Sequence, residues 1–273
     1  MADNTYQQKI LQWQREKDEG IRRENSWLAL AGLFWLKPGE NRIGSNPKCE
    51  ITLPPRAPSS LGSFFYDGKQ VSLRVYEGQT VQVNGESINE IILQTDHNEQ
   101  PSFITLNGIR MVVIERPNGM GIRIWDNQRE ERRSFPPRQW FPINENFVFA
   151  AKYVRYAEPP KVMMPNIFGQ IEEWMMDGQV IFEFEGQAQT LDVTEEEDHT
   201  LFIQFKDLTS ASRTYPPGRY IYTEAVKDGK LTLDFNMAYN PPCVFTPYAT
   251  CAFAPAQNHL KFAIEAGEIY LPH

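Results

Sequence analysis

"IRMVVIERPNGMGIRIW", residues 109–125, is the stretch that decides the fold class of this chain. Its two arms, 109–115 and 121–125, are rich in β-branched residues and largely alternate between apolar and polar side chains, as half-buried strands do. Between the arms stands Asn118-Gly119, a pair that accepts the positive φ angles of a tight hairpin turn. The stretch therefore predicts an antiparallel β-hairpin.

The same combination of alternating segments and Asx-Gly pairs repeats along the chain. Further strands are predicted at 71–76, 80–84, 180–185, 201–205, 219–224 and 230–235. The other Asx-Gly pairs, each predicted to form a turn near a strand end, are Asp67-Gly68, Asn84-Gly85, Asn107-Gly108, Asp177-Gly178 and Asp228-Gly229. No βαβ spacing occurs, which disfavours doubly wound and TIM-barrel folds. The sequence predicts an all-β protein made of antiparallel sheets.

Composition limits the classes of partner. The 273 residues are 41% hydrophobic and 23% charged, as in globular proteins, and 17 Phe with 6 Trp are enough to fill a sizeable core. The formal net charge of −8 disfavours nucleic acid and anionic membranes as partners, because both would repel the chain. The longest apolar runs are too short to cross a bilayer, so no membrane partner is expected.

The N-terminal segment and the cysteines bear on location. The first twenty residues are polar and contain no apolar core of a signal peptide. The three cysteines are Cys49, Cys243 and Cys251. An odd number of cysteines without an export signal favours reduced thiols and a cytoplasmic location. A disulfide between Cys243 and Cys251 remains an alternative.

Two β domains preceded by a helix are expected. Residues 1–24 are predicted to form an N-terminal helix, because Ile10, Trp13, Lys17 and Ile21 share one face. The proline-rich segment at 134–145 interrupts the strand pattern and predicts a domain boundary. The predicted domains are therefore a β-sandwich over 25–135 and a C-terminal β-barrel or sandwich over 136–273.

The first β domain has a recognisable pattern. "KPGENRIGSNPKCEITLPPRAPSSLGSFFYDGKQVSLRV" (37–75) and the later "VQVNGESI" (81–88) resemble a forkhead-associated domain. Ser45 stands where such domains place a phosphate-binding arginine, and Ser63 stands where they place a histidine. Serine cannot replace the bidentate bonds of a guanidinium. The resemblance thus implies a degenerate forkhead-associated β-sandwich, through which a protein partner could bind.

The C-terminal part carries a second, more specific pattern. "TYPPGRYIYTEAVKDGKLTLDFNMAYNPPCVFTPYATCAFAPAQNHLKFAIEAGE" (214–268) is similar to the uncharacterised bacterial family called domain of unknown function 1684. The matching residues are Tyr215, Gly218-Arg219, Asp234-Phe235-Asn236, Ala238 to Cys243, Cys251, Asn258 and Ala266-Gly267-Glu268. This resemblance implies relatedness and fold, and it brings no activity.

A candidate site follows from the strand at 230–235. Thr232, Asp234 and the following Asn236 lie on one face of it, and Arg219 on the preceding strand is the expected partner of Asp234 across Asp228-Gly229. Such a cluster either binds a small polar or anionic ligand or is purely structural, and both alternatives remain open. The candidate ligand-binding residues are Tyr215, Arg219, Asp234, Asn236, Tyr239, Asn240, Cys243, Asn258 and Glu268.

Catalytic and metal sites are weaker alternatives. A hydrolase could use Asp234 as general base, or Cys243 as nucleophile with His259 as its base. Cys243, Cys251, His259 and Asp234 could together bind zinc, but their spacing lacks the usual Cys-x-x-Cys or His-x-x-x-His pattern. We therefore predict no metal and no cofactor, and the leading hypothesis is non-catalytic binding of a small ligand. An interaction scaffold built on the first domain is a third alternative.

Overall fold

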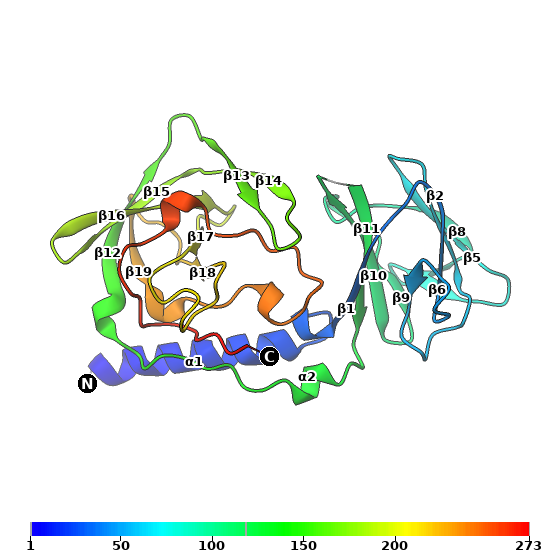
Figure 1. Ribbon diagram of the computed structural model, residues 1–273, viewed down its shortest axis with the longest axis horizontal. Coiled ribbons are helices and arrows are strands. Elements are labelled where there is room, and N and C mark those ends of the chain that lie inside the picture. Colours follow the sequence, from blue (N-terminus) through cyan, green and yellow to red (C-terminus); the bar gives the residue numbers. More distant parts are fainter. Residues whose placement is uncertain (1, 118, 273) are drawn as a thin grey trace. The chain divides into compact units, whose positions relative to one another are not determined.

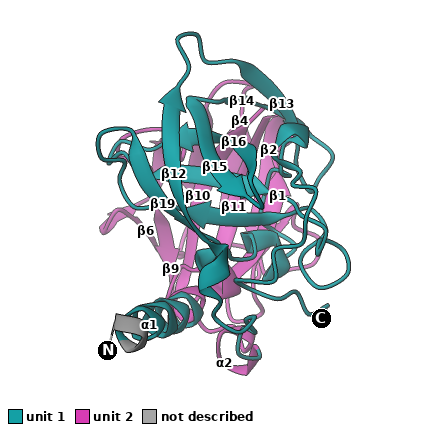
Figure 2. Ribbon diagram, turned by 90° about the vertical axis from the view of Figure 1, so that its left-hand side faces the viewer, with its two compact units in different colours: residues 1–19, 136–273 teal, residues 20–135 magenta. Residues whose placement is uncertain are grey.

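The computed structural model describes residues 2–117 and 119–272. It divides the chain into two compact units, coloured separately in Figure 2. The N-terminal unit comprises residues 20–135, and the C-terminal unit comprises residues 1–19 together with 136–273. Helix α1 (Ala2–Arg22) contributes most of its length to the C-terminal unit. The turn predicted at Asn118-Gly119 cannot be assessed in full, because Asn118 lies outside the described residues.

The N-terminal unit contains two sheets. Their strand orders are β1-β11-β10-β9-β6-β7 and β3-β2-β4-β5-β8. Phe64 and Leu73 of the second sheet join Val113 and Ile122 of the first in one buried apolar cluster, so the two sheets form a sandwich. The elements are η1 (Trp27–Ala29), β1 (Leu30–Trp35), β2 (Gly39–Gly44), β3 (Ile51–Thr52), β4 (Gly62–Tyr66), β5 (Val71–Val75), β6 (Val81–Val83), β7 (Glu86–Ile88), β8 (Glu90–Leu93), β9 (Ile104–Leu106), β10 (Ile109–Arg116), β11 (Gly119–Asp126) and α2 (Glu131–Ser134).

The C-terminal unit is built on one six-stranded antiparallel sheet, curved into a half-barrel. Its strand order is β18-β17-β16-β15-β12-β19. A separate hairpin, β13-β14, accompanies it, and short helical turns lie in the connections (Figure 1). The elements are η2 (Glu145–Phe147), β12 (Val148–Arg155), β13 (Lys161–Pro165), β14 (Ile171–Met175), β15 (Gly178–Phe184), β16 (Gln187–Glu195), β17 (Leu201–Phe205), β18 (Arg219–Tyr222), β19 (Lys230–Asp234), η3 (Phe235–Met237), η4 (Pro242–Val244) and η5 (Ala256–Asn258).

Aromatic rings fill the concave face of the half-barrel. Phe235 is fully buried, and its ring lies 5.1 Å from that of Phe205 and 5.8 Å from that of Phe182. Leu233 is buried in the same cluster. Because side chains alternate along a strand, Thr232 and Asp234 of β19 are directed away from this apolar cluster.

The sheet does not close between β18 and β19. These strands follow one another in sequence, yet β18 pairs with β17 and β19 pairs with β12. The expectation that they meet across Asp228-Gly229 is therefore wrong: that turn closes only a bridge between Lys227 and Lys230. Beyond β19 the chain returns, and Tyr239 forms two backbone hydrogen bonds of 2.9 Å with Tyr220 of β18. We call the open edge between β18 and β19 the seam.

Several predicted turns have the expected backbone. Asn84-Gly85, Asn107-Gly108 and Asp228-Gly229 have positive φ at both residues. Asp177-Gly178 does not form such a turn, since Gly178 begins β15. A Cβ atom on Gly178 would lie only 2.5 Å from the carbonyl oxygen of Val154, so glycine is needed there for close strand approach.

Helix α1 packs against the C-terminal unit by one face, as the predicted stripe requires. Ile10 is fully buried, and the ring of Trp13 lies edge-on to that of Trp140 with 5.3 Å between centroids. Figure 1 shows the helix running along the side of the unit below β18 and β19. The fold-class prediction, all-β with antiparallel sheets and one long N-terminal helix, is confirmed.

Candidate functional site

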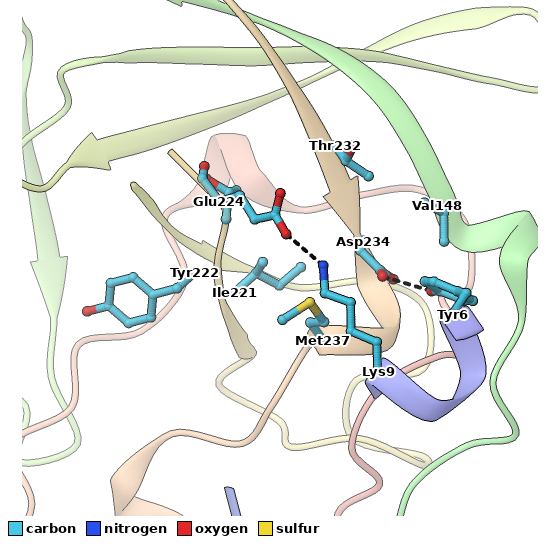
Figure 3. Close-up of a pocket in the computed structure, with 10 residues that line it drawn as sticks. Tyr6, Lys9, Val148, Ile221, Tyr222, Glu224, Thr232, Asp234 and Met237 are labelled. Carbon is cyan, nitrogen blue, oxygen red and sulfur yellow. Dashed lines mark hydrogen bonds and ion pairs between the residues drawn. The ribbon is translucent and has the colours of Figure 1, made fainter. Parts of the chain in front are cut away.

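A cavity of about 190 Å³ occupies the seam. Its walls come from β18 and the residues after it, from β19 and η3, from the start of β12, and from the first turns of α1 (Figure 3). We call it the seam cavity; its lining residues are Tyr6, Lys9, Val148, Ile221, Tyr222, Thr223, Glu224, Thr232, Asp234 and Met237. Apolar side chains surround a few polar groups, which is the usual composition of a small-molecule site.

Asp234 is the best-connected polar group of the cavity. One carboxylate oxygen accepts a hydrogen bond of 2.8 Å from the hydroxyl of Tyr6. The other accepts from the backbone N–H of Asn236 at 2.9 Å and from its side-chain amide at 3.0 Å. Asn236 in turn accepts from the backbone N–H of Asn144 at 2.9 Å. This network fixes the carboxylate in one orientation at the wall of the cavity.

Tyr6 is held as a neutral donor. Burial, followed by the hydrogen bond to Asp234, keeps the pKa of Tyr6 well above its ordinary value. Its hydroxyl also accepts a hydrogen bond of 3.0 Å from Asn236. Tyr6 therefore positions Asp234 and does not act as a base near neutral pH.

A second polar pair lies at the mouth of the cavity. Lys9 of α1 and Glu224 form an ion pair of 2.7 Å, drawn as a dashed line in Figure 3. The hydrogen bond from Lys9 lowers the pKa of Glu224, which keeps this carboxylate charged. The two side chains are 59% and 71% exposed, and such solvent-exposed pairs contribute at most about 1 kcal/mol. A ligand can thus separate them at small cost.

Arg219 is directed elsewhere. Its guanidinium forms a buried ion pair of 2.9 Å with Asp207, and both side chains are only 1% exposed. It also donates to the backbone carbonyls of Ile264 at 3.0 Å and Ala266 at 2.5 Å. The expected pairing of Arg219 with Asp234 is therefore wrong. Asp207 follows β17 (Leu201–Phe205), the strand that comes before β18 in the sequence and pairs with it.

Glu268 and Asn240 form another buried cluster. Arg138 makes a two-point ion pair with Glu268, and the Glu268 carboxylate accepts from the backbone N–H of Asn240 at 2.7 Å. The side chain of Asn240 donates to the carbonyl of Ile269 at 3.0 Å. Tyr239 lies beside this cluster, with the ammonium of Lys17 4.0 Å from its ring centroid. These contacts attach the C-terminal segment to the half-barrel.

Asn258 joins two strands. Its amide accepts from the backbone N–H of Asp192 at 2.7 Å and donates to the carbonyls of Asp192 and Gln204, each at 2.8 Å. Strands β16 and β17 pair only through Thr194, Glu195 and their partners. The Asn258 side chain thus supplies hydrogen bonds where the two strands separate.

Tyr215 and Cys243 occupy a fourth location. Burial and then an interaction with the Cys243 thiol raise the pKa of Tyr215, and the backbone N–H of Cys243 donates to the sulfur of Cys251 at 3.2 Å. His259, the expected base, lies instead 3.3 Å from the carbonyl oxygen of Ala254. Among the described residues, no group of three or more His, Cys, Asp or Glu side chains could hold a metal ion, so the zinc site considered above is not formed.

The nine candidate residues fall into several hydrogen-bonded groups, two of which meet where the Arg219 guanidinium donates to the Glu268 carbonyl at 3.5 Å. Only Asp234 lines the seam cavity, with Asn236 directly behind it. Sequence reasoning missed Tyr6, Lys9 and Glu224. The first two belong to the predicted N-terminal helix, for which no binding role was expected. The one available signal was that Tyr6 shares the helix face of Ile10 and Trp13.

In the N-terminal unit, the two arginines nearest the forkhead-associated pattern already have partners. Arg42 forms an ion pair of 2.8 Å with Glu50, and Arg56 makes two hydrogen bonds, of 2.7 and 2.5 Å, to the carboxylate of Asp126. The hydroxyl of Ser45 donates to the carbonyl of Ala57 at 2.8 Å. Neither arginine replaces the guanidinium that Ser45 lacks.

Comparisons with known proteins extend these observations. A family model described as "Protein of unknown function (DUF1684)" matches residues 133–269. No curated protein matches the chain. Within the range that the structure describes, no helix combines the length and the apolar character needed to cross a membrane.

Several solved structures are similar to parts of the chain. An uncharacterized protein of Haloarcula marismortui is 28% identical, with 51% of this chain and 80% of that chain covered and a TM-score of 0.42. The FHA domain of FhaA, complexed with the intracellular domain of Rv3910, is 19% identical, covers 33% of this chain and 82% of its own, and has a TM-score of 0.24. The cytoplasmic domain of the sorting platform protein PscD from P. aeruginosa is 21% identical, with coverages of 40% and 82% and a TM-score of 0.22. Forkhead-associated domains are thus among the solved structures to which part of this chain is similar.

Proposed function

The chain belongs to the family described as "Protein of unknown function (DUF1684)", and we therefore propose its function from the geometry of the C-terminal unit alone: it binds a small polar ligand in the seam cavity. The observation that carries the proposal is the convergence of Tyr6, Glu224 and Asp234 on one hollow from three separate segments of the chain. The cavity volume of about 190 Å³ is below the roughly 300–1,000 Å³ of pockets for drug-sized ligands, so a small ligand is expected.

The charges of the cavity select the kind of ligand. Asp234 and Glu224 contribute two carboxylates, against the single ammonium of Lys9. Because like charges repel and carboxylates only accept hydrogen bonds, a ligand that donates fits best. We propose a small neutral or cationic ligand that carries hydroxyl or ammonium groups, in place of the anionic ligand considered from the sequence.

Binding is favoured over catalysis for this cavity. Both oxygens of Asp234 already accept hydrogen bonds from within the protein. Cys243 is not among the residues that line the cavity. A general base at Asp234 would have to give up its bond from Tyr6 before it could accept a substrate proton.

The test is a thermal-shift and calorimetric screen of the full chain against small amines, amino alcohols and polyols. We expect at least one of these to raise the melting temperature, and we expect both Tyr6→Phe and Asp234→Asn to weaken its binding at least tenfold. Tyr156→Phe is a matched control, because Tyr156 donates a similar bond of 2.7 Å to Asp192 outside the cavity. The proposal fails if no compound binds the wild type, or if the two cavity variants bind as well as the control.

A protein-interaction role of the N-terminal unit is a second candidate. Arg110 lies over the ring of Phe103, with 3.6 Å to its centroid, and no hydrogen bond or ion pair engages its guanidinium among the described residues. Both line an open hollow of about 460 Å³ with Asn84 and Asn127. Exposed Arg and aromatic side chains are enriched at interfaces. Pull-downs with the full chain and with Arg110→Ala, before and after phosphatase treatment of the lysate, test this role; unchanged retention of every partner by the variant would exclude the hollow.

A further inference from the structure

Two of the three cysteines meet in the C-terminal unit. The backbone N–H of Cys243, in η4, donates to the sulfur of Cys251 at 3.2 Å. Both cysteines are free, and neither forms a disulfide. Cys243 is partly exposed, whereas Cys251 is buried. Cys243 is therefore the more accessible residue of the pair.

The surroundings make these two thiols unequal. Hydrogen bonds from Cys251 and Tyr215 lower the pKa of Cys243, although burial opposes them. The same contact with Cys243, and then burial, raises the pKa of Cys251. Cys243 is thus the more acidic thiol of the two. A partly exposed thiolate next to a buried thiol is the arrangement required for an attacking and a resolving cysteine.

Other chemistry fits this pair less well. No third metal ligand joins the cysteines among the described residues. His259, which would have to serve as base in a hydrolase, lies against the carbonyl of Ala254. The donor near Cys243 is instead the hydroxyl of Tyr215, whose own pKa is raised by burial and by its bond to Cys243. Tyr215 can stabilise a thiolate but cannot remove a proton from water.

We propose that Cys243 and Cys251 form a thiol site that reduces a small hydroperoxide and closes to a disulfide. In the first step the Cys243 thiolate attacks one peroxide oxygen. An S–O bond forms, the O–O bond breaks, and the departing hydroxide takes up the proton that Cys243 released, which yields water. Cys243 is now a sulfenic acid.

In the second step the sulfur of Cys251 attacks the sulfur of Cys243. The S–S bond forms, the S–O bond breaks, and the departing hydroxide leaves as a second water with the proton of Cys251. With hydrogen peroxide, two thiols lose two electrons and the peroxide is reduced to two waters. A low-molecular-weight thiol would return the site to its dithiol form by exchange.

This site is separate from the proposed ligand cavity. Neither cysteine lines the seam cavity, and the hydrogen bonds of Tyr6 and Asp234 described above run to each other and to Asn236. Loss of peroxide reactivity therefore leaves ligand binding intact, and loss of ligand binding leaves peroxide reactivity intact. The two proposals fail independently.

The experiment uses the full chain with Cys49→Ser, so that only the two paired thiols remain. After treatment with hydrogen peroxide we expect both thiols to disappear together, the intact mass to fall by two hydrogen atoms, and a linked peptide to appear in a non-reducing digest. In Cys251→Ser the sulfenic acid of Cys243 should persist and be trapped by dimedone. In Cys243→Ser the remaining Cys251 should react at least tenfold more slowly.

The control is the Cys243→Ser, Cys251→Ser chain that keeps Cys49, a partly exposed thiol without a cysteine partner. Its rate sets the background for an ordinary accessible thiol. The proposal is overturned if Cys243 reacts no faster than this background, if the oxidised protein contains no Cys243–Cys251 link, or if Cys251 reacts first. If a variant fails to fold, peptide mapping of the oxidised wild-type chain still shows whether the Cys243–Cys251 link forms.

Discussion

Replacement of Arg219 by methionine tests whether this residue stabilises the protein or serves a ligand. Methionine keeps much of the side-chain volume and removes the charge. The substitution deletes the ion pair with Asp207 and the bonds to the carbonyls of Ile264 and Ala266. It also leaves the carboxylate of Asp207, whose side chain is 1% exposed, without its counter-charge.

The expected cost is large because the carboxylate cannot be rehydrated at that position. Removing one partner of a buried ion pair typically destabilises a protein by about 3–5 kcal/mol. Asp207 keeps bonds from Thr209, at 2.7 Å from the backbone N–H and 2.6 Å from the hydroxyl, which offset part of the loss. We therefore expect Arg219→Met to lower the free energy of unfolding of the C-terminal unit by roughly 4 kcal/mol.

Urea unfolding, followed by tryptophan fluorescence and circular dichroism, measures this change. Arg213→Met is the matched control, since Arg213 pairs with Glu265 at 2.6 Å on the same C-terminal segment. That pair is 48% and 54% exposed, so its loss should cost less than about 1 kcal/mol. A double-mutant cycle with Asp207→Asn then isolates the coupling between Arg219 and Asp207.

The reasoning is refuted if Arg219→Met and Arg213→Met destabilise the protein equally. It is also refuted if Arg219→Met leaves stability unchanged but abolishes the thermal shift of a ligand that the wild type binds. In that case the guanidinium of Arg219 would bind the ligand, which is one of the two alternatives left open by the sequence. Its contacts with the C-terminal segment would then contribute little to stability.

Three further outcomes are expected. A Cβ on Gly267 would lie 2.5 Å from a carbonyl oxygen, so Gly267→Ala should destabilise the protein by more than the ~1–2 kcal/mol cost of a left-handed backbone. A Cβ on Gly186 would meet nothing within 4 Å, so Gly186→Ala should show that backbone cost alone in thermal unfolding. Asn258→Ala should lower stability by about 3 kcal/mol and accelerate hydrogen exchange of the Asp192 amide, since buried partners lose their bonds; unaltered exchange there would contradict the assigned role. Because the pKa of Cys243 is lowered, its alkylation by iodoacetamide should be half-maximal below about pH 8.5, the pH at which a free thiol is half ionised. A midpoint above that pH would contradict the lowered pKa of Cys243.

The sequence predicted what depends on local pattern. The hairpin arms at 109–115 and 121–125 became β10 and β11, because alternation and turn residues act between neighbours in the chain. Alternation also predicted that Asp234 lies opposite Leu233 and Phe235, but it left open which face is the inner one; the structure places Leu233 and Phe235 in the apolar cluster. Gly178 shows the limit of the turn rule: the same dipeptide serves a turn or a close strand contact, and only the packing decides.

Partners across long sequence separations could not be predicted. Tyr6 reaches Asp234 over 228 positions, and no pattern in either segment encodes that contact. The partner of Arg219 was misassigned because sequence neighbours were taken as sheet neighbours. In the half-barrel, β18 and β19 are instead the two edges, and the partner of Arg219 is Asp207, which follows β17.

Burial and saturation of hydrogen bonds separate the motif residues that hold the fold from those available to a solute. Arg219, Asn258 and Glu268 are 2% exposed or less, and their polar atoms are mostly engaged by backbone groups or charged partners. Rotating any of them toward a ligand would leave buried carbonyls or charges unpaired, at a cost of about 1–3 kcal/mol for each group. Asp234 and Cys243 differ because Asp234 lines the seam cavity and Cys243 is partly exposed. A family motif can therefore combine both kinds of residue on one short segment, and chemistry is to be sought at the members whose bonds can be exchanged without unpairing the core.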